Sequence, residues 1–209
     1  SHMFQPILPV SLQTFVIKGP GEQIYYPQII HLQNITAQQT MNQKIYQQLQ
    51  NLRREQYESQ QADFFQEMLG QYEVKTNERN VLSLSLTNYA YAPYHAHGLT
   101  LMKSLTFAVK TGKSYQLHEL FKPNSQYQDV LKKIIERQIK ERNLDTFDEP
   151  ITISSNQDFY IADKALVIYF QLYEITPYYV GFPMFPISIY EIQDIILEDG
   201  PLGKMLESG

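Results

Sequence analysis

The stretch Leu166–Ile189, LVIYFQLYEITPYYVGFPMFPISI, indicates how the chain folds. An apolar run typical of a buried strand passes into a segment crowded with tyrosine, proline and phenylalanine, and a second apolar run follows. Hairpin-like clusters of strands recur along the chain, whereas long helical patterns occur twice and stand apart from the strands. Because strands and helices do not alternate, this order favours an α+β fold over a doubly wound α/β fold.

Two amphipathic helices are expected from the periodicity of apolar residues. The first has Thr36 as its N-cap and ends at Gly70, and its other face carries glutamine, asparagine, arginine and glutamate. The second runs from Tyr127 to Asn143. The residues that define the apolar face of the first helix are Met41, Ile45, Leu49 and Leu52.

Short alternating runs bounded by turn signals predict the strands. Gly19-Pro20-Gly21 and Thr111-Gly112-Lys113 are turn signals, and Pro27 indicates an edge position or a bulge because proline cannot donate to a sheet. We expect two packed lobes, 4–92 and 93–209, each with antiparallel strands against one helix. The expected strands are residues 12–17, 24–30, 71–76, 81–92, 104–110, 151–154, 158–161, 165–175 and 186–190.

The composition excludes several classes of protein. Of the 209 residues 43% are hydrophobic and the net charge is −5, which is typical of a globular chain and argues against a nucleic-acid partner. The chain has no cysteine, so disulfides, thiolate catalysis and cysteine-ligated zinc are excluded. No run approaches the eighteen apolar residues of a membrane span. Ser1-His2-Met3 is typical of the scar of a cleaved affinity tag.

Six short segments, each weak alone, occur in an order that is moderately specific. They are Tyr25–Ile29 (YYPQI), Ala96–Gly98 (AHG), Lys103–Phe107 (KSLTF), Lys110–Lys113 (KTGK), Leu117–Lys122 (LHELFK) and Leu172–Tyr178 (LYEITPY).

The first of these segments, with the helix that follows it, resembles the start of the accessory domain found beside PdaC, a peptidoglycan deacetylase. The other five segments resemble the extracellular part of the anti-sigma-V factor (the RsiV-like family), whose best-known members sense lysozyme. The resemblance implies an exported or anchored cell-envelope protein of Gram-positive bacteria. It also implies that chemistry belongs to a separate catalytic domain, and this sequence carries neither a Thr-Phe followed by paired aspartates nor a His-x-x-x-His.

The sequence therefore predicts a non-enzymatic, extracellular binding domain, which recognises lysozyme or a wall glycan and whose export signal or anchor has been removed. Tyrosine and phenylalanine held in proline-containing loops offer large contact areas at low entropic cost. Alternation along the flanking strands places Tyr173 and Phe185 in the core. No cofactor is expected. The candidate binding residues are Tyr178, Tyr179, Phe182, Tyr91, Tyr94 and His97.

Two other kinds of site are weighed against structural explanations. His95 and His97 lie two apart and could begin a zinc site, but zinc needs three or four protein ligands and the remaining histidines are scattered, so turn-lining side chains are the favoured interpretation. Glu174, paired with Asp163 or Glu191, could serve a wall-glycan hydrolase. Nothing in the spacing supports such a pair, and a hydrogen-bonded structural carboxylate is favoured.

Overall fold

The computed structural model describes residues 9–207, so the expected tag scar, residues 1–3, lies outside the described residues. Nine strands in two sheets, together with helices that do not alternate regularly with them, form the described part of the chain. The expected α+β class is confirmed. No helix in this part of the chain is both long and apolar enough to cross a membrane.

The chain divides into two compact units, Ser1–Ser114 (unit 1) and Tyr115–Gly209 (unit 2). The sequence predicts a boundary between residues 92 and 93 instead. The boundary lies later because β5 (Leu99–Ala108) pairs with β4 (Val81–Tyr91) over nearly its whole length and so belongs to the first sheet.

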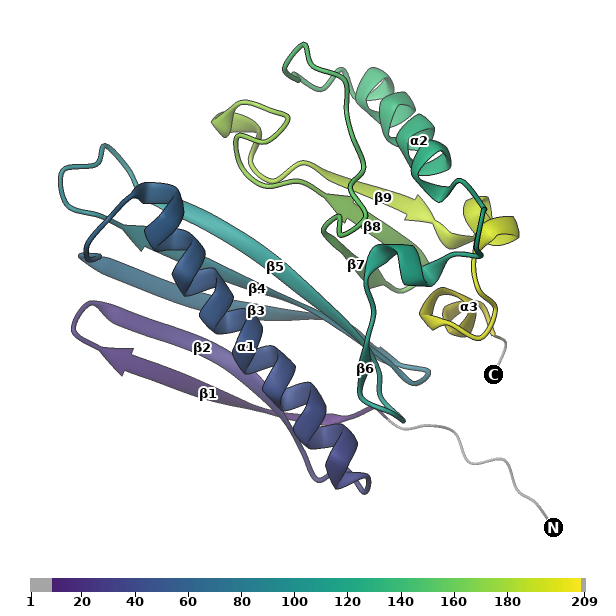
Figure 1. Cartoon of the computed structure of the whole chain (residues 1–209), viewed down its shortest axis with the longest axis horizontal. Helices are drawn as coiled ribbons and strands as arrows, with labels where there is room; N and C mark the ends of the chain where they lie inside the picture. Colours follow the sequence, from purple (N-terminus) through teal and green to yellow (C-terminus); the bar gives the residue numbers. More distant parts are fainter. Residues whose placement is uncertain (1–8, 208–209) are drawn as a thin grey trace. The chain divides into compact units, whose positions relative to one another are not determined.

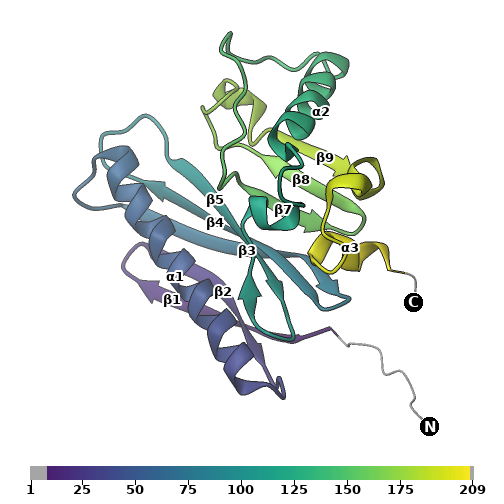
Figure 2. The same ribbon diagram turned by 45° about the vertical axis from the view of Figure 1, so that its right-hand side comes forward.

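Unit 1 is a six-stranded sheet with one long helix, α1 (Ile35–Gln60), lying across one of its faces (Figures 1 and 2). The strands lie in chain order, and neighbours are antiparallel except β2 and β3, which are parallel because α1 connects them across the sheet. The strands not yet given bounds are β1 (Ser11–Gly19), β2 (Glu22–Ile30), β3 (Glu67–Glu78) and β6 (Lys113–Ser114).

The core of unit 1 forms where the apolar face of α1 meets the sheet. The four periodic residues predicted for this face, Met41 to Leu52, are all buried, as expected. They pack in two clusters against residues of the strands, among them Leu84 of β4 and Ile24 of β2. Burying one side chain of this size contributes about 1.5–3 kcal/mol, so this contact holds the helix on the sheet.

The ends of α1 differ from the prediction. Asn34, not Thr36, caps the helix, and its side chain accepts a hydrogen bond from the Ala37 main chain at 3.1 Å. The helix ends at Gln60, because Gln61 is left-handed (φ 50°). Gly70 lies within β3, where a Cβ would come within 2.5 Å of the Ile24 side chain. This glycine therefore permits a close approach between strands instead of ending a helix.

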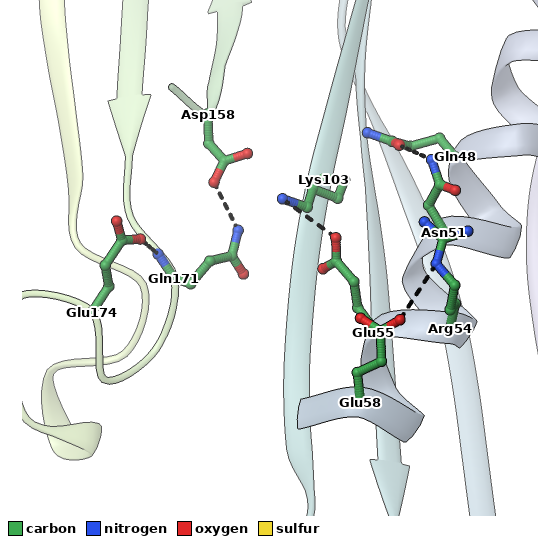
Figure 3. Close-up of polar contacts among 9 residues, drawn as sticks. All are labelled: Gln48, Asn51, Arg54, Glu55, Glu58, Lys103, Asp158, Gln171 and Glu174. Atoms are coloured by element: carbon green, nitrogen blue, oxygen red, sulfur yellow. Dashed lines mark hydrogen bonds and ion pairs between the residues drawn. The ribbon is translucent and has the colours of Figure 1, made fainter. Parts of the chain in front are cut away.

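A buried glutamine joins α1 to the strand ends. Gln56 is 0% exposed, and its Nε2 donates to the main-chain oxygens of Asn88 at 3.0 Å and of Leu99 at 2.9 Å. Its Oε1 accepts from Gln60 Nε2 at 2.8 Å, and the same Gln60 nitrogen lies 3.1 Å from the Ala90 oxygen. Nearer to solvent, Lys103 of β5 lies opposite a glutamate of α1, as Figure 3 shows.

Strands β2 and β3 pair over three residues and then diverge. Pro27 lies beyond this pairing and pairs with Thr14 of β1. Because β2 is an inner strand of the sheet, the edge position expected for Pro27 is wrong; the proline is tolerated where β3 has already diverged from β2. The side chain of Asn42 accepts from the main-chain nitrogen of Ile29 at 2.7 Å and donates to its oxygen at 3.0 Å. Asn77 makes the same reciprocal pair with Val10, at 2.9 Å in each direction. Side-chain amides thus satisfy main-chain groups where the sheet opens.

Unit 2 is a three-stranded antiparallel sheet in the order β7-β8-β9, and α2 lies alongside β9 (Figure 1). Helix α2 buries three apolar residues, and it is tied to β9 by Gln138, which donates to the Pro186 oxygen at 2.8 Å. The elements are η1 (Leu117–Leu120), α2 (Tyr127–Glu141), β7 (Phe159–Ala162), β8 (Ala165–Tyr169), η2 (Tyr178–Val180), β9 (Met184–Ser188), η3 (Ile189–Ile195) and α3 (Pro201–Leu206).

Two predicted strands of unit 2 are wrong in extent or in kind. The run predicted to continue from Ala165 to Ile175 ends as a strand at Tyr169. Residues 151–154 form no strand, and their main chain is bound instead by Gln128 of α2, which donates to the Ile153 oxygen at 2.7 Å. In both segments tertiary contacts outweigh local strand propensity.

Candidate functional site

Exposed aromatic side chains gather on the loop between β8 and β9 of unit 2, and on the segment that follows α2. Tyr169 and Met184 pair across the two strands and close the base of the loop. The chain between these two residues therefore forms a long loop outside the sheet. The four aromatic side chains are Phe147 (44% exposed), Tyr173 (46%), Tyr178 (48%) and Tyr179 (74%), and we call them the aromatic patch.

A tight turn directs Tyr173 outward, although it was expected in the core. Tyr173 has a left-handed main chain (φ 68°), and Glu174 donates from its main-chain nitrogen to the Gln171 oxygen at 3.2 Å. The Glu174 carboxylate accepts from the Gln171 main chain at 2.9 Å, and the Gln171 side chain donates to Asp158 at 2.9 Å (Figure 3). The prediction for Tyr173 is therefore wrong, whereas Phe185 is buried as expected.

Tyr173 and Tyr178 hold each other in place. Their rings stack with centroids 5.4 Å apart and planes inclined by 28°. Pro177 precedes the short helix η2, and Gly181 ends it with a positive φ (φ 77°, ψ −154°) that favours glycine, its nitrogen donating to the Tyr178 oxygen at 3.0 Å. Offset stacking of this kind contributes beyond the area it buries.

The segment after α2 supplies the other half of the patch. Phe147 donates from its main-chain nitrogen to the Ile175 oxygen at 2.9 Å, which joins the two segments. The Tyr179 hydroxyl donates to Asp145 Oδ2, and this hydrogen bond, with a smaller contribution from burial and from the nearby charge, raises the pKa of Tyr179 above its usual value. The phenol therefore stays protonated and fixed through the physiological pH range.

The two segments that carry the aromatic patch are acidic. Residues 143–149 and 171–183 contain four acidic side chains and no lysine or arginine. Their exposure leaves them open to a partner, although salt screens such charges. The acids are Asp145, Asp148, Glu149 and Glu174.

The remaining candidate residues lie in different places. Phe182 is half-buried in the same loop as Tyr178 and Tyr179. Tyr91, Tyr94 and His97 belong to unit 1, where Tyr94 is fully exposed in the loop between β4 and β5, and Tyr91 donates from its hydroxyl to the His95 oxygen at 2.9 Å. The structure thus gathers two of the six candidates into the aromatic patch.

Sequence reasoning missed Phe147 and Asp145. Both follow the expected end of the second helix, in a segment with no periodic signal. Their role depends on the pairing of Phe147 with Ile175, a contact between distant parts of the sequence. The one local signal is a phenylalanine flanked by acids before a proline, which is typical of an exposed loop.

The structure gives most residues of both alternative sites, the zinc site and the catalytic carboxylates, ordinary structural roles. Among residues 9–207 no group of three or more histidine, cysteine, aspartate or glutamate side chains is placed to hold a metal ion. His95 Nδ1 lies 3.2 Å from Gln60 Oε1. Glu191 forms an ion pair with Arg137 at 2.6 Å, and Glu174 caps the turn described above. Two of the three carboxylates weighed for hydrolysis therefore have structural partners.

Comparison with solved structures identifies the fold class. The chain is similar to a member of the DUF3298 family from Bacteroides fragilis, with a TM-score of 0.72 and 12% identity over 98% of this chain and 100% of that one. It is also similar to a DUF3298 family protein from Pseudomonas aeruginosa, with a TM-score of 0.70 and 12% identity over 96% of this chain and 98% of that one. At this identity the likeness shows a common fold.

Two family models match the chain, one in each unit. Residues 21–100 match the model described as deacetylase PdaC, and residues 118–190 match the protein of unknown function DUF3298. No curated protein matches the chain. The expected resemblance to an accessory domain of the PdaC type is thereby confirmed. In this chain a stretch that matches the PdaC model is followed by one that matches the DUF3298 model.

Proposed function

We propose that this chain is a non-enzymatic binding protein of the cell envelope, and that the aromatic patch of unit 2 binds a basic protein such as a cationic lysozyme. The match to deacetylase PdaC supports a cell-envelope context. Three residues of the patch lie in or beside Leu172–Tyr178, the segment that resembles the anti-sigma-V factor. The observation that carries the proposal is the set of four exposed aromatic side chains, of which Tyr173 and Tyr178 stack on each other and Tyr179 is bonded to Asp145.

The patch is organised before any partner arrives. Tyr173 stacks on Tyr178, Tyr179 is held by Asp145, and the two segments are joined through the main chain of Phe147. Binding through such rings costs little side-chain entropy, because their orientation is already set. Tyrosines of this kind are the residues that most often dominate the affinity of protein interfaces.

The charge of the patch favours a cationic protein as the partner. Its two segments carry four acids and no base, and the whole chain has a net charge of −5. Acidic side chains around an aromatic centre accelerate encounter with a positive surface and disfavour negative ones. A glycan without charge would gain nothing from this arrangement.

Calorimetry with egg-white lysozyme tests the proposal. We expect saturable binding that weakens between 50 and 500 mM salt, since the acids are exposed. Tyr178→Ala and Tyr179→Ala are expected to weaken it by about thirtyfold or more, the effect of removing a central interface side chain. Tyr190→Ala is the matched control, because Tyr190 is 58% exposed and follows the other end of β9.

Four results would contradict the proposal. If lysozyme does not bind at 50 mM salt, it is not the partner. If Tyr178→Ala and Tyr190→Ala weaken binding equally, the aromatic patch is not the binding site. Soluble wall fragments that bind at Tyr178 while lysozyme does not would make the partner a glycan. Cleavage of those fragments, abolished by Glu174→Gln in a folded protein, would make the chain a hydrolase and overturn the non-enzymatic proposal.

A further inference from the structure

A hollow of about 290 Å³ opens on unit 1, and neither the family matches nor the proposed function assigns it a role. Its lining residues are Gln66, Glu67, Tyr89 and Tyr91. Both tyrosines are half-buried, whereas the glutamine and the glutamate are exposed. Ligand sites in proteins have volumes of about 300–1,000 Å³, so this hollow has room for one small ring.

The register of the sheet brings these residues together. Glu67 at the start of β3 lies opposite Tyr91 of β4, and Gln66 donates from its main chain to the Tyr91 oxygen at 2.8 Å. Two residues along the strand, Leu69 lies opposite Tyr89. Alternate strand residues share one face, so the lining tyrosines lie side by side on the same face of β4.

This face is the one turned away from α1. Asn88 and Ala90, which alternate with the lining tyrosines, are bound on the other face by Gln56 and Gln60 of the helix. The buried hydrogen bonds therefore fix the main chain that carries both rings. The Tyr89 ring is also held against Gly98, where a Cβ would come within 2.4 Å of it.

The polar groups of the hollow are free to meet a ligand. Among residues 9–207 the side chains of Gln66 and Glu67 and the hydroxyl of Tyr89 have no hydrogen-bond partner. They offer an amide that donates and accepts, a carboxylate that accepts, and a phenol that does both. No cationic side chain lines the hollow.

We propose that this hollow binds a single uncharged sugar ring of a glycan chain. Two aromatic side chains provide apolar contact for the C–H groups of a pyranose, and the amide, carboxylate and phenol provide partners for its hydroxyl or acetamido groups. The hollow opens to solvent, so the chain can continue beyond the bound ring. An anion such as phosphate is disfavoured by Glu67 and finds no cation.

A cationic ligand is the nearest competitor, because two tyrosines and a carboxylate also suit a quaternary ammonium group. Such groups are bound inside aromatic cages whose rings surround the charge. Here both rings come from one face of a single strand, so they line the hollow without surrounding a charge. This arrangement therefore favours a neutral sugar ring over a cation.

Titration of the ¹⁵N-labelled full chain with tri-N-acetylchitotriose tests this inference. We expect saturable NMR shifts of the amides of residues 66–67 and 89–91, with a dissociation constant on the order of 1 mM. Tyr89→Ala is expected to weaken binding at least about tenfold. Tyr46→Ala, which removes a half-exposed tyrosine of α1, is the matched control and leaves the affinity unchanged.

Two further variants keep the test decisive. Gln66→Ala changes an exposed position, so the variant should fold as the parent does, and we expect about fivefold weaker binding from the lost hydrogen bonds. Glu67→Gln retains an acceptor, so a neutral sugar should bind within about threefold of the parent. A cation would lose far more when the charge is removed.

The inference is overturned by absence of saturable shifts at 20 mM sugar, by shifts confined to residues 171–183, or by choline binding where the sugar does not. It stands apart from the proposed function, because lysozyme binding is tested at the aromatic patch of unit 2. If the protein does not bind one of the two ligands, binding of the other can still be measured.

Discussion

The tyrosines that line the hollow of unit 1 lie on a strand, whereas those of the aromatic patch of unit 2 lie on a loop. Tyr89 and Tyr91 are held by the paired main chain of β4, which the buried Gln56 fastens to α1. Tyr178 and Tyr179 are held by exposed contacts, a ring stack and one phenol–carboxylate hydrogen bond.

The two settings suit different kinds of ligand. Rings on a sheet stay half-buried and close together, so they suit a small, rigid ligand. Rings on a loop project farther and cover more area, so they suit a protein surface, and their supporting contacts are open to water and to salt. Substitutions should therefore cost more stability beneath the hollow than beneath the patch.

The largest effect is expected from Gln56→Ala. The substitution leaves the buried main-chain oxygens of Asn88 and Leu99 without the Gln56 donor and opens a cavity. The free energy of unfolding should therefore fall by about 3 kcal/mol. Urea denaturation followed by circular dichroism measures this loss. Gln47→Ala, on the exposed face of the same helix, should stay within about 0.5 kcal/mol. Equal losses in the two variants would show that the buried network does not support the strand.

Gly70→Ala comes next. Its Cβ would lie 2.5 Å from Ile24 Cγ2 and 3.2 Å from the Ile24 Cα, so β2 and β3 must move apart. We expect this to lower the free energy of unfolding by about 2 kcal/mol. Gly19→Ala is the control, because its Cβ would meet only Glu22 Cβ, at 3.8 Å. Thermal unfolding compares them, and a Gly70→Ala protein as stable as the parent would contradict the close approach.

A smaller effect is expected at Gly181 in the loop of unit 2. A Cβ there meets nothing within 4 Å, so the cost of Gly181→Ala arises from the main-chain conformation alone (φ 77°, ψ −154°), at about 1 kcal/mol. Gly181→Asn should cost about as much as Gly181→Ala, since ψ −154° lies outside the left-handed helical region that asparagine tolerates. A Gly181→Ala protein that melts at the same temperature as the parent would contradict the requirement for glycine at this position.

The smallest effect concerns the ionisation of Tyr179. Its pKa is raised from an ordinary value of 10.0 by the hydrogen bond to Asp145, so Asp145→Ala should lower it toward that value. A raised pKa in the folded state stabilises the fold below pH 10, and that contribution disappears as the pH rises through the folded value. NMR of ¹³C-labelled tyrosine follows the titration. Asp148→Ala serves as the control, and a Tyr179 pKa that is identical in both variants would exclude the hydrogen bond as its cause.

Periodicity predicted the parts of the fold that depend on burial. Met41, Ile45 and Leu49 recur as one helical face and are buried, because the hydrophobic effect acts on pattern and needs no long-range detail. Helix ends depend on capping geometry instead. Asn34 and Thr36 are both acceptable caps, and only the path of the chain decides between them.

The aromatic patch was half predictable for a related reason. Tyr178 and Tyr179 follow a proline in a loop, a local signal, and they are exposed. Phe147 joins them through a main-chain bond to Ile175, and Tyr173 turns outward because its φ is positive. Both facts depend on the three-dimensional path of the chain, which a single sequence does not record.

The paired amides of Asn42 and Asn77 have a consequence for how the molecule behaves at high concentration. Where β2 and β3 part, an exposed ladder of donors and acceptors would be a template on which another chain could add a strand. Asn42 occupies both main-chain groups of Ile29, and Pro27 offers no donor beside it. The protein's own carboxamides thus occupy main-chain groups at Ile29 and Val10, which makes the opening a poorer template for fibrous assembly with a neighbouring copy.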